Sequence, residues 1–551
     1  MTDLLTAATP RELIPAGRHP GRVVAGRIAR KAARSGALWG LIFAIFVFIQ
    51  MRAYTSDYPT QASRDQLQRA FATNMGLNAL IGPVHDDTVT GFAAWRFLGI
   101  LGVLGAVWGL LLSTRLLRGE EEAGRHELLL AGQTTRRGAF GQSVAGLGAG
   151  LGALFAVTAI GTVLTGRSAA VGFTLGQSLY FALTLVAGAT LFLAIGALAS
   201  QLAGTRRQAA AMAGVVFGVF FALRMAADAN SGLHWMVWLS PLGWIEQSRP
   251  LTDPDPLVLL PVLALIIVAG TVAAYLAGTR DADAATLAAR DCAPPHLTLL
   301  NGPTGLALRL IRPVAAGWLC AITAFAVLLG SIAESSTQDS SGSVSVTQDL
   351  GRLGAHGSLV QEYLGLTFIL IALLIALVAA GQITAIRAEE GDGRLENLVV
   401  RPLSRTSWFA GRLALAALVL LAAGLLAGLA AWAGAAGWHN AVGLGSLMAA
   451  GLNVVPPAMF LLGLGALGLG AWPRCTSAAV YGYLAWSFLI ELTGAVVHAD
   501  HWLMDTSIFF HMVPSPAANP DWAGAAMMAG LALAAALAGG ALLHRRDLLR
   551  A

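Results

Sequence analysis

Two stretches of this 551-residue chain decide its architecture: residues 118–137 read RGEEEAGRHELLLAGQTTRR, and residues 387–405 read RAEEGDGRLENLVVRPLSR. Each contains an arginine, a pair of glutamates and a Gly-Arg-x-Glu motif, in the same order and at the same spacing. An ordinary solvated loop with a few ion pairs would not need this pattern twice. We therefore interpret the two stretches as the sign of an internal duplication.

Further matches between the two halves of the chain support the duplication. The separation of matched residues drifts only from 269 to 266 positions, as small insertions and deletions would produce. The matched sets are Arg206 and Gly214 with Arg474 and Gly482, His234-Trp235 with His501-Trp502, and Arg280-Asp281 with Arg546-Asp547.

The composition predicts a membrane protein with many spans. Hydrophobic residues make up 56% of the chain and charged residues 12%, whereas soluble domains carry about 25% charged residues, and the mean hydropathy is +0.67. These values exclude a secreted disulfide scaffold, a coiled coil, a disordered chain and a soluble multidomain enzyme. Twelve stretches are long and apolar enough to cross a bilayer: 36–53, 92–114, 138–165, 171–200, 208–228, 257–279, 313–333, 362–386, 408–434, 443–472, 477–498 and 522–543.

The basic residues predict the orientation. With both termini in the cytoplasm, most of the 35 lysines and arginines fall in cytoplasmic segments. Six spans per half is an even number, so the two repeats are expected to be parallel. We predict a basic amphipathic cytoplasmic segment (1–35), a first six-helix repeat (36–280), a cytoplasmic linker (281–312) and a second six-helix repeat (313–551). Residues 17–34 fit either an interfacial helix or the ordinary positive flank of the first span.

Lys31 is the only lysine in the chain; the other 34 basic residues are arginines. A Walker A loop needs a Gly-Lys-Ser/Thr sequence, but Lys31 follows Arg30 and precedes Ala32. The chain therefore has no P-loop of its own. The carboxylates of the two repeated loops lack the His/Cys/Asp spacing of a metal site, and three outer histidines, His234, His498 and His501, form only a weak candidate. We predict no catalytic residue, metal or bound cofactor in this chain.

The acidic pair, the Gly-Arg-x-Glu motif after the second span and the Arg-Arg-Asp sequence after the last span resemble the membrane subunits of ABC-2-type exporters. The fused 12-span form resembles the permeases of polyketide-antibiotic (tetronasin-type) exporters, which include mycobacterial multidrug-efflux permeases. The resemblance covers almost the whole chain. The loops differ in detail, because Ala131-Gly-Gln-Thr stands where the second half has Val400-Arg-Pro-Leu. This difference leaves open whether the two loops contribute equally.

The resemblance implies an all-α type V (ABC-2-like) exporter fold in a bacterial plasma membrane. It also implies two copies of a separately encoded nucleotide-binding subunit, which hold ATP and Mg²⁺ and dock under the two loops. The permease would then move amphipathic drugs or antibiotics outward by alternating access. The implied coupling residues are Glu120, Glu121, Gly124, Arg125 and Glu127 in the first loop and Glu389, Glu390, Gly393, Arg394 and Glu396 in the second.

The resemblance also places the second and fifth spans of each half along the substrate path. The candidates there are Trp108, Phe217, Phe220, Phe221, Arg224, Ser487, Glu491 and His498. Aromatic stripes of this kind are also common in plain helix packing or lipid contact. Arg224 aligns with Glu491, so we predict that the two charges approach each other; separate local partners are the alternative. The segments 234–246 and 501–516 are too short to span and fit re-entrant or interfacial helices, or simple aromatic anchors.

Three rival functions remain. An exporter of a lipid or cell-envelope precursor would have the same sequence features. A membrane-embedded transferase would show clustered Asp, His and Arg residues at the membrane face and would have no reason to duplicate a loop. A proton-driven secondary carrier would need buried carboxylates in several spans, whereas Glu491 is nearly alone.

Overall fold

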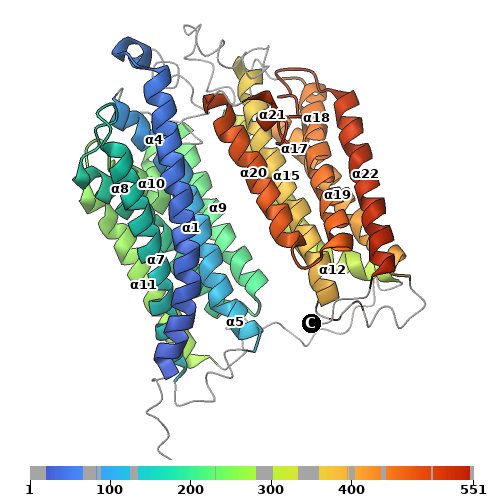
Figure 1. Cartoon of the computed structure of the whole chain (residues 1–551), viewed down its shortest axis with the longest axis horizontal. Coiled ribbons are helices and arrows are strands. Elements are labelled where there is room, and N and C mark those ends of the chain that lie inside the picture. The colour runs from blue at the N-terminus through green and yellow to red at the C-terminus, as the bar shows by residue number, and fades with distance from the viewer. Residues whose placement is uncertain are drawn as a thin grey trace, which may run out of the picture. The chain divides into compact units, whose positions relative to one another are not determined.

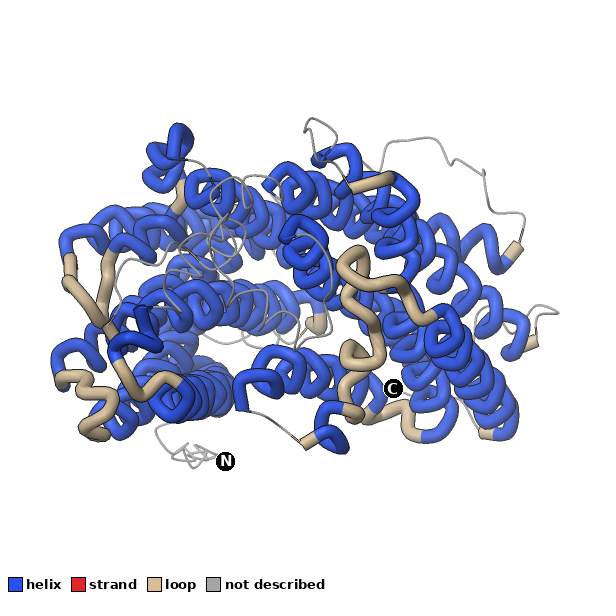
Figure 2. Tube along the Cα trace, turned by 90° about the horizontal axis from the view of Figure 1, so that it is seen from above, coloured by secondary structure: helices blue, strands red, loops and turns tan. Residues whose placement is uncertain are grey.

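The structure is a computed structural model, and it describes residues 20–65, 82, 88–124, 135–229, 231–280, 302–332, 359–391, 393, 395, 404–435, 442–497 and 500–546. All regular secondary structure in these ranges is helical (Figure 2). The described residues fall into two compact units. The first is drawn from Met1–Met51, Val89–Arg224 and Trp235–Asp291, and the second from Arg52–Thr88, Met225–His234 and Cys292–Ala551.

The first unit contains long helices that run roughly alongside one another (Figure 1). They are α1 (Pro20–Asp57), α4 (Val89–Leu116), α7 (Arg136–Gly166), α8 (Leu175–Leu202), α9 (Arg206–Ala229) and α11 (Leu259–Thr279). A five-residue helix, α5 (Arg118–Glu122), follows α4. Three short helices, η1 (Ser231–Leu239), α10 (Pro241–Gln247) and η2 (Pro256–Val258), connect α9 to α11.

The second unit repeats this order. Its long helices are α12 (Pro303–Ile332), α15 (Leu359–Gly391), α17 (Arg405–Ala435), α19 (Val455–Ala471), α20 (Thr476–Val497) and α22 (Trp522–Arg545). The shorter α18 (Leu444–Asn453) precedes α19, and α21 (His501–Met504) lies between α20 and α22.

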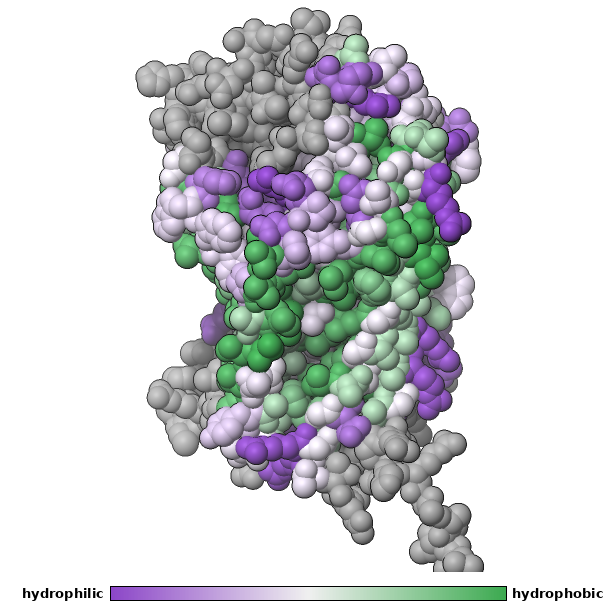
Figure 3. Space-filling model, turned by 90° about the vertical axis from the view of Figure 1, so that its left-hand side faces the viewer, coloured by the Kyte–Doolittle hydropathy of each residue, from purple (hydrophilic) through white to green (hydrophobic). Residues whose placement is uncertain are grey.

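Eleven helices within the described residues are long and apolar enough to cross a membrane, which confirms the all-α polytopic architecture. The stretch Leu444–Ala471 counts as one of them although its helix is interrupted at Val454. Helix α20 occupies the remaining expected stretch, 477–498, and is not among the eleven. On the face drawn in Figure 3, hydrophobic residues form a broad band with hydrophilic residues above and below it, as a bilayer-spanning protein requires.

Helix α1 is continuous from Pro20 to Asp57. Its 38 residues correspond to about 57 Å, well beyond the roughly 30 Å of a hydrocarbon core. The basic residues from Arg27 to Arg34 therefore belong to the same helix as the first span.

Small residues bring the long helices into close contact. A Cβ atom added at Gly36 of α1 would overlap the carbonyl oxygen of Gly150 in α7, and one added at Gly463 of α19 would overlap the carbonyl oxygen of Ala532 in α22. Close backbone approach through glycine and alanine is the usual packing mode of helices in membranes. This packing fixes the helix ends, where the charged side chains lie.

Candidate functional site

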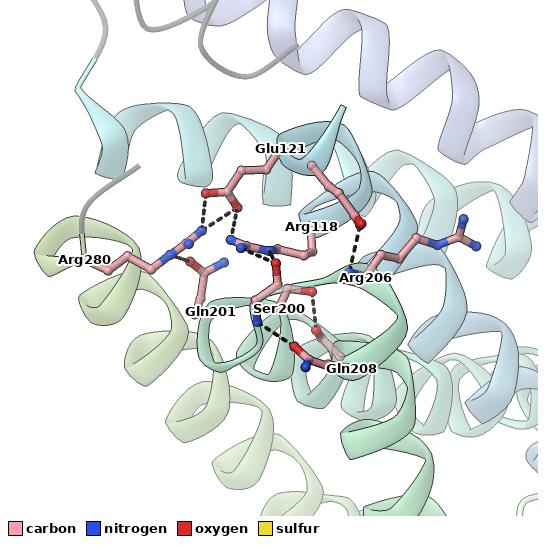
Figure 4. Close-up of polar contacts among 10 residues, drawn as sticks. Arg118, Glu121, Ser200, Gln201, Arg206, Gln208 and Arg280 are labelled. Carbon is pink, nitrogen blue, oxygen red and sulfur yellow. Dashed lines mark hydrogen bonds and ion pairs between the residues drawn. The ribbon is translucent and has the colours of Figure 1, made fainter. Parts of the chain in front are cut away.

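Glu121 lies at the centre of a charged cluster at one end of the first unit (Figure 4). Its carboxylate accepts hydrogen bonds of 2.7 and 2.5 Å from Nη2 of Arg280, the residue that follows α11. Nη1 of Arg118 lies 3.0 Å from the same carboxylate. Arg280 also donates from Nε to the side-chain oxygen of Gln201 at 2.9 Å, and Arg118 donates from Nε to the carbonyl oxygen of Gly204 at 3.0 Å. One acid thus joins the ends of the second, fourth and sixth helices.

Glu390 forms the corresponding contact in the second unit. Arg546, at the end of α22, donates from Nη1 and Nη2 to the two carboxylate oxygens at 2.6 and 2.7 Å. Its Nη2 also donates to the carbonyl oxygen of Leu469 in α19 at 3.1 Å. The Glu390 side chain is only 4% exposed, so this two-point contact between arginine and carboxylate is of the strong, directional kind.

The two clusters use matched positions of the two repeats. Glu121 and Glu390 are 269 positions apart, and Arg280 and Arg546 are 266 apart. We call the Glu121–Arg280 and Glu390–Arg546 pairs the helix-end clamps. A third contact recurs as well: Arg136 donates to the carbonyl oxygen of Arg280 at 2.7 Å, and its counterpart Arg405 donates to that of Arg546 at 3.1 Å. The sequence analysis identifies Arg280 and Arg546 as matched positions of the repeat and as part of the family resemblance, but it does not place them in the site.

The first glutamate of each acidic pair has a different partner in the two repeats. Glu120 contacts α1, with Lys31 Nζ at 2.8 Å and Arg27 at 3.7 Å. Glu389 contacts α17, with Arg412 Nη2 at 2.9 Å. The side chain of Lys31 is 46% exposed and that of Arg412 only 2%. The single lysine therefore contacts the acidic pair of the first repeat, whereas a buried arginine takes that role in the second repeat.

Two glycines end the acid-bearing helices at the same place. Gly124 and Gly393 have φ angles of +67° and +71°, in the left-handed region that favours glycine. Their amides donate to the carbonyl oxygens of Glu121 at 2.8 Å and Glu390 at 3.1 Å. This is the usual glycine stop of a helix. The other predicted loop residues, Arg125, Glu127, Arg394 and Glu396, lie outside the described residues.

The predicted aromatic residues of α9 stack on one another. The Phe217 and Phe221 rings lie parallel with centroids 5.9 Å apart, and Phe192 of α8 meets Phe217 edge-on at 5.3 Å. The guanidinium of Arg224 lies 5.4 Å from the Phe221 centroid. Phe217, Phe221 and Arg224 therefore lie on one face of α9.

Arg224 has a partner within its own unit. It is 3% exposed, and its Nε lies 3.8 Å from a carboxylate oxygen of Glu246 in α10. Burial raises the pKa of the Glu246 carboxyl, and the Arg224 guanidinium opposes that rise. Glu491 belongs to the other unit, and the two units are described separately. The predicted approach of Arg224 to Glu491 therefore stays a prediction.

Three further predicted path residues, Trp108, Phe220 and Ser487, take part in hydrogen bonds within their own units. Trp108 is 4% exposed and donates from Nε1 to Ser35 of α1 at 3.0 Å, as the packing alternative expects. The carbonyl oxygen of Ser487 accepts a hydrogen bond from Ser507 at 3.1 Å, and that of Phe220 accepts one from Ser240 at 2.7 Å. These two bonds again occupy matched positions, so each repeat ties its connecting segment to its fifth long helix. His498 lies outside the described residues.

Sequence comparisons agree with the duplicated geometry. The profile of the family described as "Multidrug efflux system permease Rv1217c, C-terminal domain" matches the chain twice, over residues 35–277 and again over residues 300–544. The chain is also 31% identical over 479 residues to the multidrug efflux system permease protein Rv1217c of Mycobacterium tuberculosis (strain ATCC 25618 / H37Rv), an alignment that covers 86% of this chain and 85% of the relative. The double match confirms the repeat.

Proposed function

The chain belongs to the Rv1217c family of multidrug efflux system permeases, and from that premise we propose that it is the membrane subunit of an ATP-driven ABC exporter. In this proposal it moves amphipathic drugs or antibiotics out of the cell by alternating access. It adopts the type V arrangement with α20 as a twelfth span and with both termini in the cytoplasm, in a bacterial plasma membrane. Two copies of a separate nucleotide-binding subunit drive it.

The duplicated helix-end clamp is the observation that carries this proposal. A subunit that pushes on the loop after α5 or α15 needs a rigid connection from that loop into the bundle. Glu121 and Glu390 provide one, since each ties the loop-bearing helix to the end of the sixth long helix of its repeat. Breaking a buried ion pair of this kind costs about 3–5 kcal/mol, so the clamp resists deformation when a partner exerts force.

The ATPase chemistry is assigned to the partner. The single lysine, Lys31, contacts Glu120 and stands in no Walker A sequence. The partner subunits would hold ATP and Mg²⁺, and this chain would hold neither. Glu120, Glu121, Glu389 and Glu390 would then act in coupling by fixing the loops.

Transport into inside-out vesicles tests the proposal. We expect uptake of a lipophilic fluorescent drug only when the permease and its ATPase subunits are both present with ATP. The double variant Glu121→Gln/Glu390→Gln should retain ATPase activity but lose most ATP-dependent uptake. Uptake driven by a proton gradient without the ATPase would overturn the proposal in favour of a secondary carrier. Competition by a lipid or cell-envelope precursor, with no uptake of drugs, would reassign the cargo to that class.

A further inference from the structure

Helix α4 leaves one stripe of side chains accessible. Most of the helix is buried in the structure, with Phe97, Leu101 and Trp108 among its buried residues. The part-buried positions recur every three or four residues, which places them on one face of the helix: Phe92, Arg96, Ile100, Val103, Leu104 and Val107. The stripe continues through the exposed Leu111 and Arg115, so α4 carries one accessible arginine near each of its ends.

Arg96 has no hydrogen-bond or ion-pair partner among the described residues, and its Nε atom is buried. Arg224, which lies in the last turns of α9, is compensated by Glu246. An uncompensated arginine at the centre of a span costs about 2.5–3.5 kcal/mol on insertion scales, and one two turns from the end of a helix, as Arg96 is, costs less. Such a residue indicates a function with a partner of opposite charge.

The second repeat shows that the fold does not require this arginine. Helix α15 has a similar alternation of buried and part-buried positions, and the offset of 269 that matches the two loops pairs Arg96 with the buried Gly365, next to the part-buried Leu366. The rest of its accessible stripe is also uncharged, at Leu370, Leu373, Leu374 and Leu377. Between Leu366 and Leu377, the accessible positions of α15 thus carry no counterpart of the Arg96 charge.

We propose that Arg96 binds the acidic group of an amphipathic ligand, a carboxylate or a phosphate ester, whose apolar body lies along Ile100, Val103 and Val107. The inference rests on the proposed export function, because that function places α4 along the substrate path. A guanidinium suits this task since its planar fork of N–H donors matches two oxygens of a carboxylate or phosphate. The acidic group belongs either to an exported compound or to an anionic phospholipid, and the chemistry at Arg96 is the same.

Binding to the purified full-length permease in non-ionic detergent tests the inference. The probe is a dansyl-labelled undecanoic acid, and its methyl ester is the uncharged match. Wild-type protein should bind the acid at least about tenfold more tightly than the ester, as expected for hydrogen bonds to a charged group. Arg96→Gln should abolish that preference and leave ester binding unchanged, whereas Arg96→Lys should retain part of it.

Arg52→Gln is the matched control, because Arg52 is an exposed arginine near the end of α1. It should leave both affinities as they are. An unchanged acid preference in Arg96→Gln would overturn the inference, and unchanged ester binding shows that this variant is folded. Native mass spectrometry distinguishes the two sources of the acidic group. If phosphatidylglycerol co-purifies with the wild-type protein and is lost from Arg96→Gln, the ligand is a lipid headgroup. If no phosphatidylglycerol co-purifies with the wild-type protein and the protein still binds the acid, the ligand is an exported compound. The binding assay needs no ATP, so it tests Arg96 independently of transport. A wild-type permease that prefers the acid but shows no ATP-driven uptake in vesicles would refute the export proposal and not the role of Arg96.

Discussion

The acidic clusters of the two repeats share one contact and differ in another. The second glutamate, Glu121 or Glu390, meets the closing arginine of its repeat in both. The first glutamate meets the exposed Lys31 in one repeat and the buried Arg412 in the other. The helix that carries the pair also differs, because Leu117 breaks it between α4 and α5 (φ −99°, ψ −80°), whereas α15 runs unbroken to Gly391. The clamp is the part that both repeats retain, and the attachment of the first glutamate is the part in which they have diverged.

The largest effect should come from the shared contact. Glu390→Ala leaves Arg546 without its carboxylate in a nearly buried site and should lower the free energy of unfolding by about 3–5 kcal/mol. Thermal unfolding of the purified protein in detergent measures this. The exchanged pair Glu390→Arg/Arg546→Glu should recover part of the loss. A Glu390→Ala variant as stable as wild type would show that the clamp does not stabilise the fold.

The second-largest loss of stability should come from the Glu389–Arg412 contact, which differs from its counterpart in the first repeat. Arg412→Ala removes the ion pair of Arg412 with Glu389, whose side chain is 13% exposed, and we expect a loss of roughly 2–3 kcal/mol because Glu389 retains some access to solvent. Unfolding measurements in the same detergent test it. Ser143→Ala at the corresponding position of α7 is the control and should cost well under half as much, since Ser143 only donates to the Ala139 carbonyl. An equal loss of unfolding free energy in the two variants would mean that the Arg412–Glu389 ion pair contributes no more to stability than the Ser143 hydrogen bond.

The glycine stops should show a smaller effect that is equal in both repeats. A Cβ atom at Gly124 or Gly393 would meet no neighbour, so alanine there costs only the left-handed backbone, about 1–2 kcal/mol. Gly391→Ala is the control, since its Cβ would also meet nothing and Gly391 is the last helical residue of α15, without a positive φ angle. That variant should be neutral or slightly stabilising. A neutral Gly393→Ala would contradict the helix stop described above.

The smallest effect should come from the exposed contact of the first repeat. Lys31→Ala should change stability by under about 1 kcal/mol, because exposed ion pairs contribute little. Raising the salt concentration from 0.05 to 0.5 M, illustrative conditions spanning roughly a threefold change in screening length, should erase the difference from wild type. An effect as large as that of Arg412→Ala, or one that persists at high salt, would show that the two attachments are equivalent after all.

The sequence could predict the features that depend on local pattern. The apolar stretches predicted the helices, and the repeated motifs predicted the duplication and the acidic pairs. The resemblance implied only a coupling role for Gly124 and Gly393, and their role as helix stops follows from their positive φ angles. The sequence could not predict which arginine meets which glutamate, because Glu121 and Arg280 are 159 positions apart and the chain holds 34 arginines. Arg96 was missed for a related reason: one arginine between Trp95 and Phe97 near the start of an expected span looks like a flanking charge. Only the burial of its neighbours shows that it lies on the helix face left accessible.

The distance along the chain between the two members of a clamp also has a consequence for biosynthesis. Glu121 leaves the ribosome 159 residues before Arg280, and Glu390 leaves it 156 residues before Arg546. At about 5–20 residues per second, each carboxylate waits roughly 8–30 s for its arginine. During that interval the glutamate has no closing arginine, because the sixth long helix of its repeat has not yet been synthesised. Each clamp would then form when its repeat is complete. The Glu121–Arg280 pair would stabilise the first repeat before the second is synthesised, and the Glu390–Arg546 pair would stabilise the second repeat afterwards.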